Sequence, residues 1–282
     1  MLSKFESTLR SLGRDIARTV PGLDGPLLEL WNAYVRLYGH TNAVLSALPR
    51  QSAPPFAVIR ADPADISRLV EVSAMPRQAR DRQVFPGSRF EYAGSVIGGD
   101  WDRSDRLFEE SELYRSFEAH FGDGVPWPET ALYDTVVGYI EAGTPLWGCT
   151  DEAAFRDRCR ELDALYDAIR RHGYKSQAEL LRNPVDDPVH GERSLPYHLR
   201  LVNHELAVCV GRDGDILFKD GRDRLAIAKV LGLDSIPVWV MIRHPQWQRL
   251  RSAVANDPSL RAHLDPALRG HPDLPETGPR SP

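Results

Sequence analysis

The chain has 282 residues, of which 42% are hydrophobic and 27% are charged, a composition that suits a globular protein with one large core or two modest ones. A mean hydropathy of -0.38 and the lack of a long uncharged apolar run argue against a transmembrane span. The net charge of -5 gives no global field that would draw the protein onto nucleic acid or anionic lipid. The three cysteines form no CxxC pair, and the chain does not begin with an uninterrupted apolar stretch of signal-peptide length. We therefore expect a cytoplasmic protein.

Two helices are predicted in the first 50 residues, which we expect to form an N-terminal helical unit. The second runs through the aromatic side chains near residues 31–38 and faces the core. The first is amphipathic, and we favour packing against the body of the protein over binding at a membrane surface. Its apolar stripe consists of Leu2, Phe5, Leu9, Leu12 and Ile16.

A mainly helical region is predicted from residue 56 to residue 183. It opens with a short buried strand at residues 56–59, and Asp62-Pro63 is a typical helix start. Residues 73–89 are predicted to be a loop, and residues 184–193 a mobile polar segment. The helices are expected at residues 107–121, 126–140, 151–171 and 176–181, and the third of these has the clearest apolar periodicity.

The segment Gly98-Gly99-Asp100-Trp101-Asp102 carries paired glycines, which let a backbone turn sharply and approach a ligand closely. Its two acids are suited to hold a metal or accept a proton. The alternative is a turn in which an aspartate caps the following helix, and spacing alone favours that alternative.

A β-hairpin–helix–β unit is predicted between Glu205 and Ile242. Asp213-Gly214 separates two short strands, which is a strong hairpin signal. A helix follows over residues 225–231, and a last strand covers residues 236–242. We assign residues 195–256 to this unit and expect it to form one compact body with residues 56–183.

The turn between the second strand and the helix is a candidate anion-binding site. Gly221 precedes the helix, whose N-terminal amides and partial positive charge attract anions. Arg222 and Arg224 can add charge-assisted hydrogen bonds to phosphate oxygens. Asp220 lies at the strand end, where it can bind a divalent cation or act as a base. A helix cap with two solvated arginines is the alternative, and the residues alone leave both open.

The stretch from Gly214 to Val238 resembles the core of the ParB/sulfiredoxin-like superfamily. It has Gly214-Asp215-Ile216-Leu217-Phe218-Lys219, then Asp220-Gly221-Arg222-Asp223-Arg224, and later Gly232 and Ile236-Pro237-Val238. That family places a Gly–x–x–Arg turn at a helix start, where the turn cradles nucleotide phosphates. Its members include chromosome-partition CTPases, sulfiredoxin and a free-serine kinase.

This resemblance implies a role for each residue of the turn. Gly221 matches the family glycine and Arg224 the arginine that contacts phosphate, whereas Arg222 falls where members vary. Asp223 departs from the family, in which His or Arg usually stands, and an acid repels phosphate unless a cation or the arginines compensate. No cysteine occupies the turn, so the resemblance does not extend to sulfiredoxin chemistry.

We therefore predict an α+β protein with a mostly helical N-terminal region packed on a small mixed sheet. The leading hypothesis is binding of ATP, ADP, CTP or a phosphorylated small molecule with Mg²⁺, extending to phosphoryl transfer to a small molecule. Asp220 is the expected metal ligand and catalytic group, and Glu205 a weaker candidate base. The residues expected to line the same cleft and contact the substrate are Asp100, Trp101, Asp102 and His244.

The alternative is a non-catalytic ParB-like binding or scaffold protein that has lost nucleotide turnover, and Asp223 is its best support. Specific DNA binding is not expected, because too few residues follow Ile242 to form a helix-turn-helix domain. Residues 266–282 are rich in Pro and Gly, and we predict a disordered tail there.

Overall fold

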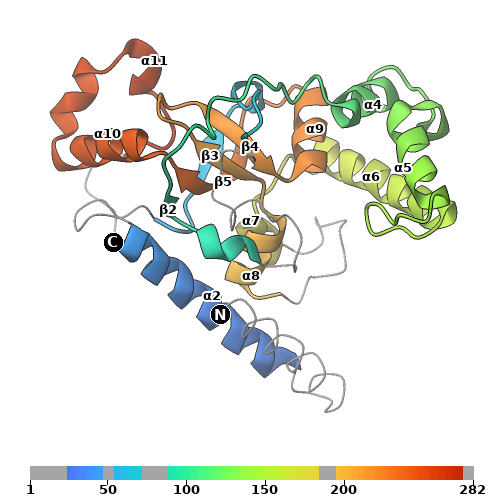
Figure 1. Cartoon of the computed structure of the whole chain (residues 1–282), viewed down its shortest axis with the longest axis horizontal. Helices are drawn as coiled ribbons and strands as arrows, with labels where there is room; N and C mark the ends of the chain where they lie inside the picture. The colour runs from blue at the N-terminus through green and yellow to red at the C-terminus, as the bar shows by residue number, and fades with distance from the viewer. Residues whose placement is uncertain (1–23, 47–53, 72–87, 184–194, 276–282) are drawn as a thin grey trace.

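The computed structural model describes residues 24–46, 54–71, 88–183 and 195–275 of the chain. These residues form the expected α+β fold, with helices around one mixed sheet (Figure 1). The elements before residue 184 are α2 (Asp24–Ser46), β1 (Val58–Ala61), η1 (Pro63–Asp65), η3 (Ser88–Tyr92), β2 (Ser95–Val96), α4 (Glu112–Phe121), η4 (Trp127–Glu129), α5 (Ala131–Glu141), α6 (Glu152–His172) and α7 (Gln177–Arg182). The later elements are α8 (Tyr197–His204), β3 (Ala207–Val210), β4 (Ile216–Asp220), α9 (Arg222–Val230), β5 (Ile236–Arg243), α10 (Pro245–Asn256), η6 (Pro258–His263) and α11 (Pro266–Arg269).

The sheet has the order β1-β5-β3-β4, and β2 pairs with the other end of β5 on the side of β1. Strands β2 and β3 run parallel to β5, whereas β1 is antiparallel to β5 and β4 is antiparallel to β3. The predicted unit at residues 195–256 therefore supplies three adjacent strands, β5, β3 and β4, but not the whole sheet. Its central strand is completed by β1 and β2, which come from the region expected to be mainly helical.

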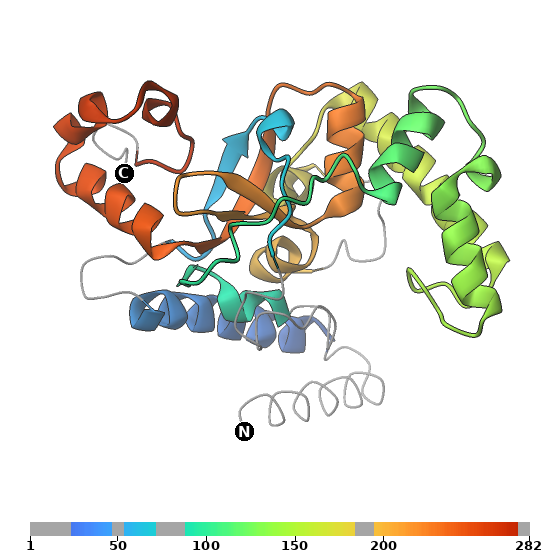
Figure 2. The same ribbon diagram turned by 45° about the horizontal axis from the view of Figure 1, so that its top comes forward.

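Both faces of the sheet are buried because helices cover each of them, and alternate residues along a strand enter different cores. In β3, Val208 and Val210 face a core shared with helices α4, α5, α6 and α9, whereas Ala207 and Cys209 face a second core shared with α2, η3 and α8. Figure 2 shows α2 along one side of the sheet and the α4–α6 helices at one end of the molecule. The turn after β4, which leads into α9, thus lies on the same side of the sheet as α4, α5 and α6.

The ends of the clearest predicted helix follow from its sequence. Asp151 caps α6 by accepting a hydrogen bond from the Ala154 amide at 2.8 Å, and Gly173 follows the last residue with a φ of 76°. Helix α8 was not expected, because the histidines and arginine of its short sequence hide its apolar side. Three of its residues are nevertheless buried against α2, η3 and the sheet: Leu199, Leu201 and Val202.

The prediction of a disordered tail from residue 266 is wrong for residues 266–275. This segment forms α11 and then folds back onto β5 and α10. Asp273 accepts hydrogen bonds from Arg243 Nε and Trp247 Nε1, each at 2.8 Å, and Leu274 is buried. A buried carboxylate with several donors, the hydrogen bond between His271 and the Gly214 carbonyl, and one buried leucine anchor the segment, so its low apolar content misled the prediction. Residues 276–282 lie outside the described residues.

No helix among the described residues is long and apolar enough to cross a membrane. The predicted amphipathic helix at residues 2–16 lies outside the described residues, as do most of the predicted loop at residues 73–89 and the predicted mobile segment at residues 184–193. Helix α2 confirms the second predicted helix, and β1 confirms the predicted strand near residue 58.

Candidate functional site

The candidate site is built on Gly221, which links β4 to α9. Its φ of 97° and ψ of 35° place it in the left-handed region, which residues with a side chain rarely adopt. A Cβ added at this position would lie 3.0 Å from Leu206 Cα, so the backbone of the neighbouring chain segment also leaves no room for a side chain. The turn therefore requires glycine for two independent reasons, conformation and close approach.

The first turn of α9 has no side-chain cap in the described residues. Asp220 is exposed, and its Oδ1 accepts a hydrogen bond from the Gly221 amide at 2.7 Å, one position before the helix. The amides within the first turn of a helix have no partner in the helix itself and point outward. The left-handed glycine and the helix start that were predicted are thus both present, and Asp220 accepts from the amide of Gly221.

Asp223, the residue that departs from the ParB/sulfiredoxin-like pattern, lies between two arginines, of which one forms a hydrogen bond with it and the other does not. Arg158 from α6 donates to Asp223 Oδ2 at 2.8 Å, and Arg222 Nε lies 3.7 Å from Asp223 Oδ1. Burial disfavours the charge of Arg158, but Asp223 and Glu161 together outweigh that effect and the pKa of Arg158 is raised; Arg158 also donates to Glu161 Oε2 at 2.8 Å. The negative charge of Asp223 is therefore directed toward α6.

Arg222 also stacks on an aromatic side chain. Its guanidinium carbon lies 4.3 Å from the ring centroid of Trp147, which belongs to the loop between α5 and α6. Trp147 has a φ of 57° and is the one non-glycine with a positive φ among the described residues. Such a conformation costs on the order of 1–3 kcal/mol and is concentrated at functional sites.

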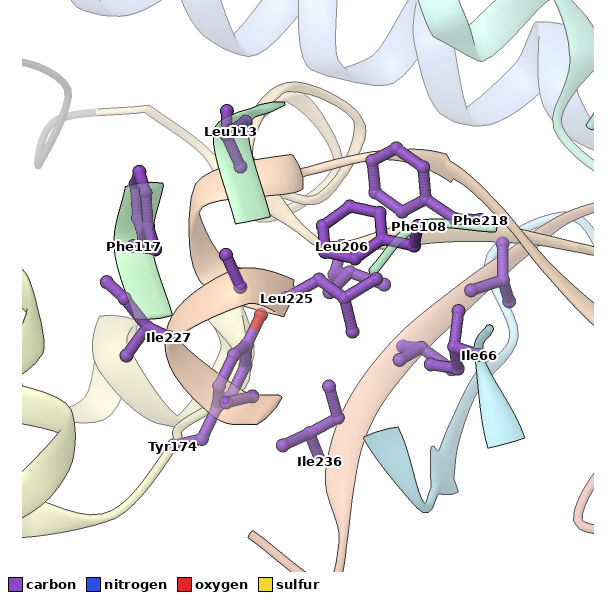
Figure 3. Close-up of a cluster of buried hydrophobic side chains, with 14 of the residues drawn as sticks. Ile66, Phe108, Leu113, Phe117, Tyr174, Leu206, Phe218, Leu225, Ile227 and Ile236 are labelled. Carbon is purple, nitrogen blue, oxygen red and sulfur yellow. The ribbon is translucent and has the colours of Figure 1, made fainter. Parts of the chain in front are cut away.

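Arg224 points to a different neighbour, Tyr174, and lies 5.9 Å from the centroid of its ring. Tyr174 is only 7% exposed, and its hydroxyl has no hydrogen-bond partner among the described residues. Burial raises the pKa of this hydroxyl, an effect that Arg224 opposes, so the group stays protonated at neutral pH. Figure 3 shows the hydroxyl of Tyr174 pointing toward α9. Among the described residues, Arg224 is thus the charged group that acts on this buried hydroxyl, although no hydrogen bond of ordinary length joins the two.

Glu205, the second candidate base, is 1% exposed. Its Oε2 accepts a hydrogen bond from the Gln177 amide at 2.8 Å, and Gln177 is the first residue of α7. A carboxylate at this position is stabilised by the partial positive charge of the helix N-terminus. The observed contact gives Glu205 a structural role, which is to hold α7 beside β3.

The residues expected to complete the cleft lie elsewhere. Asp100 and Asp102 both bind Arg212, which lies between β3 and β4, and the distances from Arg212 Nη2 are 2.7 Å to each. Asp220 pairs with Ala207 at the opposite end of this hairpin. The four residue steps from Ile216 to Asp220 span about 13 Å at 3.3 Å per residue. The expectation of one shared cleft is therefore corrected to two separate clusters.

The remaining two members of that second cluster are buried. Trp101 is fully buried, and its Nε1 donates to the Ile97 carbonyl at 2.9 Å. His244 is 6% exposed, and its Nδ1 accepts from the Gln246 amide at 3.3 Å, which caps α10. Burial lowers the pKa of His244, while Asp102 opposes that shift. Burial would raise the pKa of Asp102, but bonds from Arg212 dominate and lower it. This cluster holds the segment of Asp100 and Asp102 against the loop between β3 and β4.

Three residues of the candidate site were missed from the sequence: Trp147, Arg158 and Tyr174. Arg158 lies 65 positions before Asp223, and nothing in its helix distinguishes it from the other arginines there. Trp147-Gly148 did carry a signal, because a residue before glycine in a short loop is typical of a tight turn. That signal predicts the turn but does not predict that Arg222 of α9 packs against it.

Within the described residues there is no group of three or more His, Cys, Asp or Glu side chains placed to hold a metal ion. Asp220 thus offers a single carboxylate, and a cation there would need phosphate oxygens and water as further ligands. A scan of protein-family models, a search of curated proteins and a search of solved structures each gave no match to this chain.

Proposed function

We propose that the turn from Asp220 to Arg224 binds the phosphates of a nucleotide or of a phosphorylated small molecule. The observation that carries this proposal is the left-handed Gly221, packed against Leu206 at the start of an uncapped helix. Such a turn exposes backbone amides to an anion and adds the helix dipole. The resemblance to the ParB/sulfiredoxin-like superfamily, in which this turn contacts phosphates, supports the same proposal.

Arginines near the turn offset the charge of Asp223, although Arg158 is also paired with Glu161 at 2.8 Å. Arg158 and Arg222 lie on either side of this carboxylate, and Arg224 follows it by one position. Two unit charges 4 Å apart interact by about 4 kcal/mol at an effective dielectric constant of 20, so a paired carboxylate repels phosphate far less than an isolated one. The arginines supply the compensation that the departure from the family pattern requires.

We further propose that Mg²⁺ bound between Asp220 and the phosphates supports phosphoryl transfer. Asp220 is exposed at the carboxyl end of β4, where it can reach a metal shared with phosphate oxygens. Phosphoryl transfer depends mainly on positioning and charge neutralisation, which arginines and Mg²⁺ provide. No other carboxylate of the predicted set lies at this end of the hairpin in an accessible position.

One observation favours a second candidate, a binding or scaffold protein without turnover. Glu205 is buried and engaged at the start of α7, so it is not placed to act as a base toward a ligand at the turn. The site then holds its ligand through arginines and amides and has one accessible carboxylate, Asp220. Binding is common to both candidates, and only turnover separates them.

The three cysteines are all free and buried, which supports the cytoplasm as the proposed location. The proposed partner is a small-molecule phosphate rather than DNA, because the net charge is -5.

Calorimetry with ATP, ADP and CTP, each with and without Mg²⁺, tests binding. We expect a measurable affinity for at least one nucleotide, and Arg224→Ala should weaken it by about 1–3 kcal/mol, as for a charged hydrogen bond. Heat in none of the titrations would refute the proposal. Release of phosphate from a bound nucleotide, lost in Asp220→Asn with binding retained, would distinguish turnover from binding alone.

A further inference from the structure

The side chain of Arg222 extends from the start of α9 to Trp147. Arg222 is the first residue of that helix, and its guanidinium rests on the indole at 4.3 Å from the ring centroid. The indole is partly buried, and Phe155 packs edge-on against it, with ring centroids 5.8 Å apart and an interplanar angle of 87°. In a nucleotide, the ribose separates the base from the phosphates in a similar way, so phosphates at Gly221 place a base near this ring.

The backbone holds Trp147 in that place at a conformational cost. Trp147 and Gly148 both have positive φ values, 57° and 76°, and the Cys149 amide donates to the Leu146 carbonyl at 2.9 Å across the turn. Two successive left-handed residues are typical of a type I′ turn, which favours Asn, Asp and Gly rather than Trp. A large aromatic side chain at this position therefore opposes the local backbone preference, and the ring contacts Phe155 on one side of the loop and Arg222 of α9.

Replacing the contact between Arg222 and Trp147 by a contact between a nucleobase and Trp147 is expected to increase ligand affinity. A cation–π contact at an exposed site contributes roughly two- to fivefold to an equilibrium constant. Stacking of a nucleobase on an aromatic side chain contributes roughly five- to 150-fold. Arg222 gains a charge-assisted bond if it moves from the ring to a phosphate. Replacing arginine by a base on the ring is thus favourable on both sides of the exchange.

We infer that Trp147 is the stacking platform for the base of the bound ligand, so that the ligand is a nucleotide rather than a phosphorylated molecule without an aromatic ring. In the free protein Arg222 covers the indole. In the complex Arg222 contacts phosphate and the base takes its place on Trp147. This inference rests on the proposed function, because the phosphates bound at Gly221 position the base.

The test compares ATP and CTP with tripolyphosphate, which carries the phosphates and lacks the base, by calorimetry on the full chain at one fixed salt concentration. The main variant is Trp147→Asn, because asparagine tolerates the left-handed conformation and should leave the turn intact. Trp147→Tyr keeps a stacking surface and serves as the matched control. Thermal melts of both variants verify the fold.

We expect the better nucleotide to bind roughly five- to 150-fold more tightly than tripolyphosphate. Trp147→Asn should remove this preference and leave tripolyphosphate affinity within about threefold, whereas Trp147→Tyr should retain most of it. Equal affinity for nucleotides and tripolyphosphate, or a preference that survives in Trp147→Asn, overturns the inference while the phosphate site stands. Binding of none of the three ligands overturns the proposed function and this inference together.

Discussion

The buried pair between Arg243 and Asp273 predicts that the C-terminal segment stabilises the whole sheet. Arg243 is the last residue of β5 and is fully buried, and the side chain of Asp273 is 2% exposed. Arg251 adds a second guanidinium, with its Nε 3.7 Å from Asp273 Oδ1. Replacing Asp273 with Asn keeps the shape of the side chain and removes the charge that both arginines require.

The size of the effect follows from the burial of the partner. Removing one member of a buried ion pair typically costs about 3–5 kcal/mol, because the other charge is left without compensation. Whole proteins are stable by only about 5–15 kcal/mol, so Asp273→Asn removes a large part of the total. At about 2–4 °C for each kcal/mol in a chain of this size class, the melting temperature should fall by roughly 6–20 °C.

Urea denaturation followed by circular dichroism measures the change, with Asp265→Asn as the matched control. Asp265 lies in the same C-terminal segment but is exposed, and it accepts from the Ala267 amide as a helix cap, a position where Asn serves about as well as Asp. The double replacement Arg243→Met with Asp273→Leu should recover only part of the loss, because an apolar pair removes the buried charge of Arg243 but leaves Trp247 Nε1 and Arg251 without their acceptor. A change below about 1 kcal/mol for Asp273→Asn would refute the buried pair.

Four further predictions concern the turn and the rest of the sheet. Gly221→Ala should lower the free energy of unfolding by about 1–3 kcal/mol and weaken tripolyphosphate binding, because residue 221 has a left-handed backbone that packs against Leu206. Thermal melts measure the first effect and calorimetry the second. Arg158→Met should weaken tripolyphosphate binding at low salt and Asp223→Asn should restore it, whereas an additive pair of effects would contradict the coupling. Burial lowers the pKa of His271 below 6.5, so its stabilising effect is complete above pH 6.5 and is lost as the pH falls toward the folded-state pKa; urea midpoints between pH 8 and pH 5 should decline, and less so in His271→Gln. Asp102→Asn should lower the urea midpoint yet leave tripolyphosphate affinity unchanged, and a weakened affinity would argue against two separate clusters.

Local sequence signals predicted much of the central unit. The hairpin at Asp213-Gly214, the glycine turn at Gly221 and the last strand are all present, because each depends on residues close together in the chain. Turn residues and apolar periodicity report the conformation of their own segment. The α+β class follows from these elements and from the helices before them.

Contacts between segments that are far apart in the chain could not be predicted from the sequence. Asp102 was a candidate substrate contact, yet its position is decided by Arg212, which is 110 residues away. Asp273 lies in a stretch whose composition is typical of disorder, yet it contacts a buried arginine in β5 and a tryptophan in α10. Charged residues that form a single buried pair leave no periodic pattern, so composition and spacing cannot reveal them.

Asp223 shows how such a distant contact bears on function. Taken in its own segment, the carboxylate opposes an anion at the first turn of α9. Arg158 reverses that conclusion, because it binds Asp223 at 2.8 Å from a neighbouring helix on the same side of the sheet. The arginine is held by a carboxylate that the turn itself supplies, so the same residue that repels phosphate also brings a guanidinium to the site. The electrostatic character of this turn therefore belongs to the pair α6–α9 and not to the five residues of the turn.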